Sequence, residues 1–103
     1  MRNFREYIVE KLKDPQEMID YLKVALEEYE KDQNTEAFLL ALRTVAEAKG
    51  GISELAKKTS LNRQNVYRVL SSKGNPKLDT LEALLHALGY RLSIEPLEKQ
   101  PSK

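Results

Sequence analysis

The order of apolar and polar residues along the 103-residue chain predicts a protein built mainly from short helices. Apolar residues recur every three or four positions in five segments, which is the spacing of a helix with one buried face. Helices are therefore expected at residues 15–30, 34–49, 52–59, 63–70 and 78–88. Asp14 and either Asn34 or Thr35 stand where N-caps are needed, and Pro15 suits a first helical position.

The N-terminal segment and two leucine-rich stretches add detail to this pattern. Residues 1–14 carry apolar side chains at helical spacing, so a short helix or an irregular N-terminal arm is favoured there over a strand. Leu39 and Leu40 widen the apolar face of the helix at 34–49, which predicts burial on more than one side. The last helix is expected to turn its leucines inward, namely Leu78, Leu81, Leu84, Leu85 and Leu88.

The stretch from Ile52 to Ser71 predicts two short helices joined by a tight turn at Ser60 and Leu61. Asn62 is expected to cap the second helix, and Ala56 is small enough to stand where the two helices cross. This spacing is typical of a helix-turn-helix unit. The outer face of its second helix carries polar and basic residues and no acid, which suits the major groove of DNA.

Residues 90–95 alternate strictly between apolar and polar side chains, which predicts a half-buried strand that ends at Pro96. A lone strand leaves its backbone groups unpaired, so it must pair with the N-terminal arm or with the same strand of a second copy. The second option would give a two-fold dimer. Residues 97–103 are expected to form a flexible tail. The fold class is thus mainly α: one domain over residues 1–103, with five helices, an N-terminal arm and one C-terminal β-strand.

Charge is distributed unevenly, although the net charge is only +1. Residues 1–50 hold 8 Lys and Arg against 11 Asp and Glu, whereas residues 51–103 hold 9 against 5. No acid occurs between Leu55 and Leu78, and this stretch holds Lys57, Lys58, Arg63, Arg68, Lys73 and Lys77. A local basic surface attracts phosphates over about a Debye length, roughly 8–10 Å, even when the whole protein is nearly neutral.

These observations assign a candidate DNA-binding surface. The base-edge candidates are Arg63, Gln64, Tyr67 and Arg68, and the phosphate candidates are Lys57, Lys58, Asn62, Ser71, Lys73, Asn75 and Lys77. Arginine prefers guanine O6 and N7 and glutamine prefers adenine N6 and N7, whereas phosphate contacts position a protein without reading sequence. Two structural alternatives stay open: Tyr67 packs on a neighbouring helix, and Arg68 forms a salt bridge to Glu54.

Other classes of function find little support in the sequence. The chain has no Cys and a single His, His86, so no metal site, disulfide or cofactor is expected. No catalytic constellation and no glycine-rich phosphate loop occur, which argues against an enzyme. The charged N-terminus is unlike a signal peptide, and no apolar run is long enough to span a membrane, so we expect a soluble, cytoplasmic protein.

The run GGISELAKKTSLNRQNVYRVLSSKGNPKLDTLEALLHALGYRLSIEP resembles the HigA-type addiction-module antidote family, within the Cro/phage-repressor helix-turn-helix superfamily. The resemblance extends from about Phe4 to Pro96. It implies a five-helix, lambda-repressor-like fold and a homodimer that binds a palindromic operator in its own promoter. It also implies a partner, a small toxin of the RelE/ParE-like class that is held inactive in the complex. Ser60 departs from the pattern, because many helix-turn-helix proteins place glycine there for a positive φ.

Three hypotheses follow from these patterns. The first is an antitoxin that represses its own operon and binds a toxin. The second is a stand-alone phage-type repressor without a toxin. The third is a protein-interaction module that does not read DNA, and the basic outer face of residues 63–71 argues against it. The neighbouring gene would separate the first two hypotheses.

Overall fold

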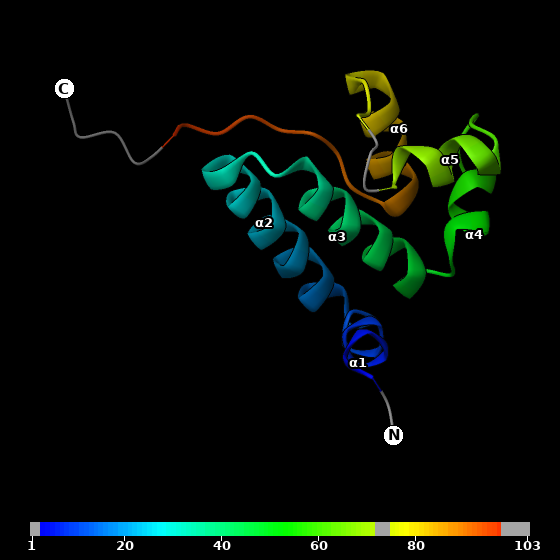
Figure 1. The fold of residues 1–103 in the computed structure, drawn as a ribbon, viewed down its shortest axis with the longest axis horizontal. Helices are drawn as coiled ribbons and strands as arrows, with labels where there is room; N and C mark the ends of the chain where they lie inside the picture. The colour runs from blue at the N-terminus through cyan, green and yellow to red at the C-terminus, as the bar shows by residue number, and fades with distance from the viewer. Residues whose placement is uncertain (1–2, 72–74, 98–103) are drawn as a thin grey trace.

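A computed structural model describes residues 3–71 and 75–97, and these contain six α-helices (Figure 1). They are α1 (Phe4–Lys11), α2 (Pro15–Asp32), α3 (Thr35–Ala48), α4 (Ile52–Lys57), α5 (Arg63–Val69) and α6 (Leu78–Leu88). Helices α2 and α3 lie side by side, α4 packs against α3, and α5 and α6 pack against α4. The mainly helical fold and the five helices expected from the sequence are confirmed, and the N-terminal arm forms a helix, α1.

Side-chain caps explain where the first three helices begin. The Asn3 side chain accepts the Glu6 N–H at 2.7 Å, and a reciprocal bond completes a capping box that starts α1. Asp14 accepts the Gln16 N–H at 2.8 Å and precedes Pro15 at the first position of α2, as predicted. Of the two residues considered for α3, Asn34 is the cap, and it accepts the Ala37 N–H at 3.1 Å.

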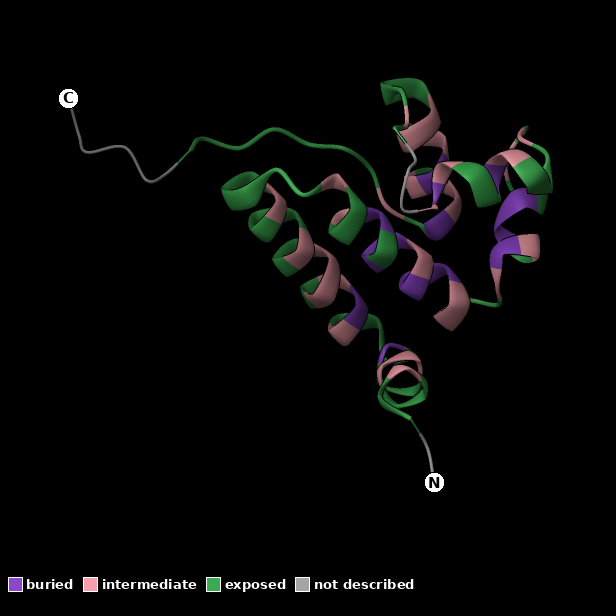
Figure 2. Ribbon diagram, in the orientation of Figure 1, coloured by how far each residue is buried: buried purple, intermediate pink, exposed green. Residues whose placement is uncertain are grey.

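The hydrophobic core contains buried residues of α3 together with buried residues of the other helices (Figure 2). Leu39, Leu42 and Val45 of α3 are at most 1% exposed, so α3 is the central helix of the core. The predicted burial of α3 on more than one side is confirmed, because its buried residues include Leu39, Ala41 and Thr44 and it packs against α1, α2 and α4. Leu40 does not contribute to this burial, since it is 52% exposed. The inward position predicted for Leu78 is wrong: it is the first residue of α6 and is 71% exposed.

The predicted strand at residues 90–95 is absent from the part of the chain that the structure describes. After α6 the chain runs as an open segment across α3 and α2, away from α1 (Figure 1). Pairing with the N-terminal arm is therefore wrong, because that arm is helical. The expected half-burial is also wrong: Leu92 is 39% and Ile94 97% exposed. A strand needs a neighbour to accept its backbone hydrogen bonds, and a single copy offers none along this path.

Two further expectations concern the C-terminal tail and the absence of a membrane-spanning segment. The predicted flexible tail lies outside the described residues, apart from Leu97. Among the helices that the structure describes, none is both long enough and apolar enough to cross a membrane.

Candidate nucleic-acid interface

Helix α4 forms the inner half of the helix pair predicted at residues 52–71. It starts after Gly51, whose φ of 101° is a conformation that glycine adopts without strain. Ile52, Leu55 and Ala56 are buried, and α4 packs against α3, α5 and α6. The helix ends at Lys57, two residues earlier than expected, because Thr59 takes part in the turn.

The turn between α4 and α5 is held by the hydroxyl of Thr59. This hydroxyl donates to the Ala56 carbonyl at 3.0 Å and accepts the Leu61 N–H at 3.0 Å, so it closes the end of α4 and fixes the backbone of Leu61. Thr59 was not among the residues expected to form the turn, although threonine commonly bonds to the backbone in turns of this kind. Among the described non-glycine residues only Gln33 has a positive φ, so Ser60 needs no left-handed conformation.

Helix α5 begins at the predicted cap. The Asn62 side chain accepts the Asn65 N–H at 2.7 Å, which satisfies one of the free N–H groups of the first turn. Val66 is fully buried and the following Leu70 is 2% exposed, so this side of the helix faces the core. The predicted base-edge residues lie on the other side and are all exposed, namely Arg63, Gln64, Tyr67 and Arg68.

Polar contacts within this exposed face restrict how its side chains are held. The guanidinium carbon of Arg63 lies 5.5 Å from the centre of the Tyr67 ring, in the range of a cation–π interaction. Arg68 donates to the Asn65 side-chain oxygen at 2.9 Å, so Asn65 links the cap to Arg68. The alternative salt bridge from Arg68 to Glu54 is not adopted, because Arg68 is bonded to Asn65 and Glu54 pairs with Lys57. Tyr67 is 41% exposed and lies close to Arg63.

The predicted phosphate candidates fall into different situations. Lys58, Asn62, Asn75 and Lys77 are exposed. Lys57 is also exposed, but its ammonium lies 3.2 Å from the Glu54 carboxylate, a contact that the sequence analysis did not foresee. The Ser71 hydroxyl is half-buried and donates to the Arg68 carbonyl at 2.7 Å. Lys73 lies outside the described residues.

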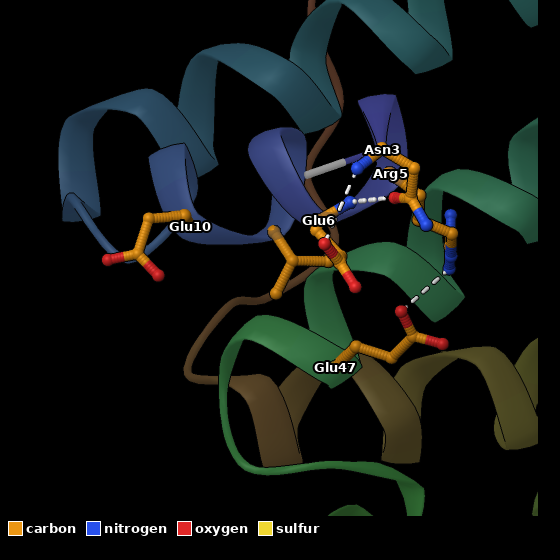
Figure 3. Close-up of a pocket in the computed structure, with 6 residues that line it drawn as sticks. Asn3, Arg5, Glu6, Glu10 and Glu47 are labelled. Atoms are coloured by element: carbon orange, nitrogen blue, oxygen red, sulfur yellow. Dashed lines mark hydrogen bonds and ion pairs between the residues drawn. The ribbon is translucent and has the colours of Figure 1, made fainter. Parts of the chain in front are cut away.

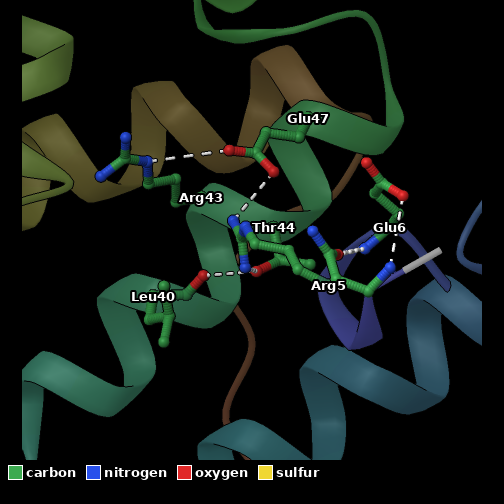
Figure 4. Close-up of polar contacts among 7 residues, drawn as sticks. Arg5, Glu6, Leu40, Arg43, Thr44 and Glu47 are labelled. Carbon is green, nitrogen blue, oxygen red and sulfur yellow. Dashed lines mark hydrogen bonds and ion pairs between the residues drawn. The ribbon is translucent and has the colours of Figure 1, made fainter. Parts of the chain in front are cut away.

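A second polar cluster joins α1 to α3 at a distance from α5. Asn3, Arg5, Glu6, Val9, Glu10 and Glu47 line a shallow hollow between these helices (Figure 3). Arg5 donates to the Thr44 hydroxyl at 2.8 Å and forms an ion pair with Glu47 at 2.9 Å (Figure 4). Thr44 is 1% exposed and donates in turn to the Leu40 carbonyl at 2.9 Å, so each polar group of this junction is bonded. The cluster anchors α1 on α3.

The fold and the exposed face of α5 define a helical protein that presents a short cationic helix without acidic residues. Residues 3–96 match the family described as probable addiction module antidote proteins. A relative in Haemophilus influenzae, described as an uncharacterised protein, is 30% identical over 88 residues, which cover 85% of this chain and 86% of the relative. No solved structure matches the chain. The chain therefore belongs to this antidote, or antitoxin, family, and such a family implies a toxin as partner in general terms.

Proposed function

We propose that this protein is a HigA-type antitoxin that represses its own toxin–antitoxin operon. In this proposal a homodimer binds a palindromic operator in the cytoplasm through a Cro-like helix-turn-helix formed by α4 and α5, and it neutralises a RelE/ParE-like toxin by direct contact. It acts as a binding protein without catalysis, cofactor or metal. The observation that carries the proposal is the exposed, acid-free face of α5 in a chain of the antidote family.

The arrangement of α4 and α5 suits the reading of base edges. A recognition helix places its N-terminal residues in the major groove while the preceding helix crosses the phosphate backbone. Arg63 and Gln64 stand in the first turn of α5 and are exposed, so they can reach guanine and adenine edges respectively. A good bidentate pair of this kind discriminates against the wrong base by about 1–3 kcal/mol. The Asn65 contact holds the Arg68 guanidinium in place before DNA arrives, which lowers the entropy lost on binding.

The N-terminal half of the chain supports the toxin part of the proposal. Residues 1–50 have three more acidic than basic residues, and they form the three helices that lie farthest along the chain from α5. An acidic surface attracts a basic partner and raises its rate of association. A toxin that cleaves RNA must bind phosphates and is therefore expected to be basic.

An operator-binding experiment with Arg68→Ala tests the DNA-reading role. Fluorescence anisotropy with a fragment of the native promoter should show a loss of affinity of about five- to 150-fold, which corresponds to about 1–3 kcal/mol. Lys23→Ala on α2 is the matched control, because it removes one exposed positive charge far along the chain from α5. Thermal melting of both variants should match the wild type. Equal affinity of all three proteins, with equal melting, would remove Arg68 from the site.

Two further measurements separate the alternatives. Purification from cells that carry the native operon should bring down the product of the neighbouring gene, and its absence would favour a stand-alone repressor. Binding of that product without any promoter binding would instead favour a protein-interaction module.

Footprinting of the promoter tests the proposed dimer. It should show two protected half-sites about 34 Å apart, the repeat of one turn of DNA. Protection of one half-site by a monomer would contradict the proposed binding of a homodimer to the operator.

A further inference from the structure

The segment from Arg91 to Leu97 is the largest unexplained feature of the surface. All seven residues are exposed, with Ile94 at 97% and Leu97 at 98% (Figure 2). Among the described residues, no backbone hydrogen bond involves this segment. Exposed apolar side chains that alternate along a backbone with free N–H and C=O groups are the features of an unpaired edge strand.

The start of this segment is firmly fixed to the helical body. Gly89 has a φ of 98° and ends α6, and the Tyr90 N–H then bonds to the Leu85 carbonyl at 2.8 Å. The Lys49 ammonium donates to the Leu88 carbonyl at 2.9 Å and lies 5.7 Å from the centre of the Tyr90 ring. The segment therefore leaves the body from a defined point, which reduces the entropy that a partner must overcome to bind it.

We propose that residues 91–95 pair with the same residues of a second copy as two antiparallel strands centred on Ser93. The proposal rests on the homodimer proposed above and names the surface that forms it. In this register Arg91 lies opposite Glu95 of the partner subunit, and Leu92 lies opposite Ile94 of the partner subunit. By two-fold symmetry each pairing occurs twice, so the ribbon has one polar face with two ion pairs and one apolar face with four aliphatic side chains.

The charges of the segment select both this register and a second copy as the occupant. Parallel pairing in register would place Arg91 opposite Arg91, and Glu95 opposite Glu95, so it is disfavoured. Shifting the antiparallel pairing by two residues in either direction separates Arg91 from Glu95 and loses both ion pairs. Pro96 has no N–H to donate and stands directly after the paired residues, where it ends the ladder. A segment that complements its own sequence in one register only is suited to self-association.

A ribbon of five residues on each strand is marginal by itself, so its charge pairs weigh heavily in the dimerisation equilibrium. Arg91→Glu turns both cross-strand pairs from attractive to repulsive, and so does Glu95→Arg. Each variant of the full chain should dimerise about tenfold more weakly than the wild type in sedimentation velocity. The double variant, in which both charges are exchanged, should regain the wild-type dimerisation constant.

An equimolar mixture of the two single variants gives the sharpest test of the register. One chain then carries two acids and the other two arginines, so both cross-strand pairs become attractive. A heterodimer should therefore form at concentrations at which each variant alone is mostly monomeric. Lys23→Glu and Glu27→Arg are matched controls: both sites are exposed on α2, they make the same charge changes, and they should leave dimerisation unchanged. Failure of the mixture and of the double variant to restore association would overturn the proposed register.

The outcomes keep this proposal distinct from the proposed function. If the charge variants dimerise like the wild type while operator binding still depends on Arg68, the strand pairing is wrong and the proposed function stands. If the variants follow the expected pattern but no promoter fragment binds, the strand pairing stands and the proposed function falls. If the wild type is monomeric and hydrogen exchange at residues 91–97 slows only when the toxin is added, the occupant is the toxin and the proposal is overturned.

Discussion

Removing the cap of α5 is the most direct way to test how the candidate DNA-reading helix is held. This helix has seven residues, and the Asn62 side chain is the acceptor for one of its first N–H groups, at 2.7 Å from the Asn65 nitrogen. Asn62→Ala removes that acceptor, so the Asn65 N–H can then bond only to water. Asn62 is exposed, so the substitution creates no cavity and its effect reports on the cap.

The expected loss of stability is about 1 kcal/mol, within a range of about 0.5–2 kcal/mol for the loss of an asparagine cap. A change of 1 kcal/mol moves the melting temperature of a domain of about 100 residues by roughly 4 °C or slightly more. Helix α5 buries Val66 and lies against α4, so the effect is expected in the global unfolding transition rather than in local fraying alone. Operator affinity should also fall, because Arg63 and Gln64 stand in the turn that the cap fixes.

Circular dichroism melting of Asn62→Ala, Asn62→Ser and the wild type measures this effect. Serine caps a helix about as well as asparagine, so Asn62→Ser should melt near the wild type while Asn62→Ala melts several degrees lower. A melting temperature of Asn62→Ala equal to that of the wild type would refute the cap as a source of stability. Equal losses in both variants would show that Asn62 acts through something other than its hydrogen bond to Asn65.

Three further predictions concern other parts of the molecule. Thr44→Val should lower the free energy of unfolding in urea by about 1–3 kcal/mol, because the Arg5 guanidinium and the Leu40 carbonyl both lose a partner at a buried position; an unchanged midpoint would contradict this. Gly89→Ala should cost about 1–2 kcal/mol in the same assay, since alanine is strained at a φ of 98°. Burial raises the pKa of Tyr90 above its usual 10.0. The phenol of Tyr90 therefore loses its proton at a higher pH in the folded protein than in the unfolded chain. The free energy of unfolding should fall as the pH rises above about 10, and Tyr90→Phe should make this fall smaller.

The sequence predicted best those features that depend on neighbouring residues. The caps at Asp14 and Asn62 are confirmed, and Asn34 is one of the two caps considered for α3, because a cap bonds to an N–H two or three positions away. The inner and outer faces of α5 were likewise predicted, since helical spacing places Gln64 and Arg68, each two residues from Val66, on the side opposite to it. The Arg5–Thr44 contact joins residues 39 positions apart, and no local pattern could indicate it.

The wrong predictions share one physical cause. An apolar residue shows that burial is favourable, but it does not show that another element is available to cover it. Leu40 follows the buried Leu39 on the same helix, yet one step of 100° leaves it 52% exposed. The alternation at residues 90–95 likewise described a strand, and the helical N-terminus left that strand without a neighbour in its own chain.

The contacts on the candidate DNA-binding face are weak enough to be exchanged for contacts with DNA. The Lys57–Glu54 pair spans 3.2 Å, but its side chains are 72% and 51% exposed, and exposed pairs of this kind stabilise a protein by at most about 1 kcal/mol. A phosphate oxygen can therefore replace Glu54 at little cost, so the pair does not remove Lys57 from the phosphate candidates. The Asn65 contact likewise uses one N–H of Arg68, whose guanidinium carries five donors and keeps the others for a base edge. The exposed face of α5 is thus partly ordered in the free protein while its hydrogen-bond donors remain available to DNA.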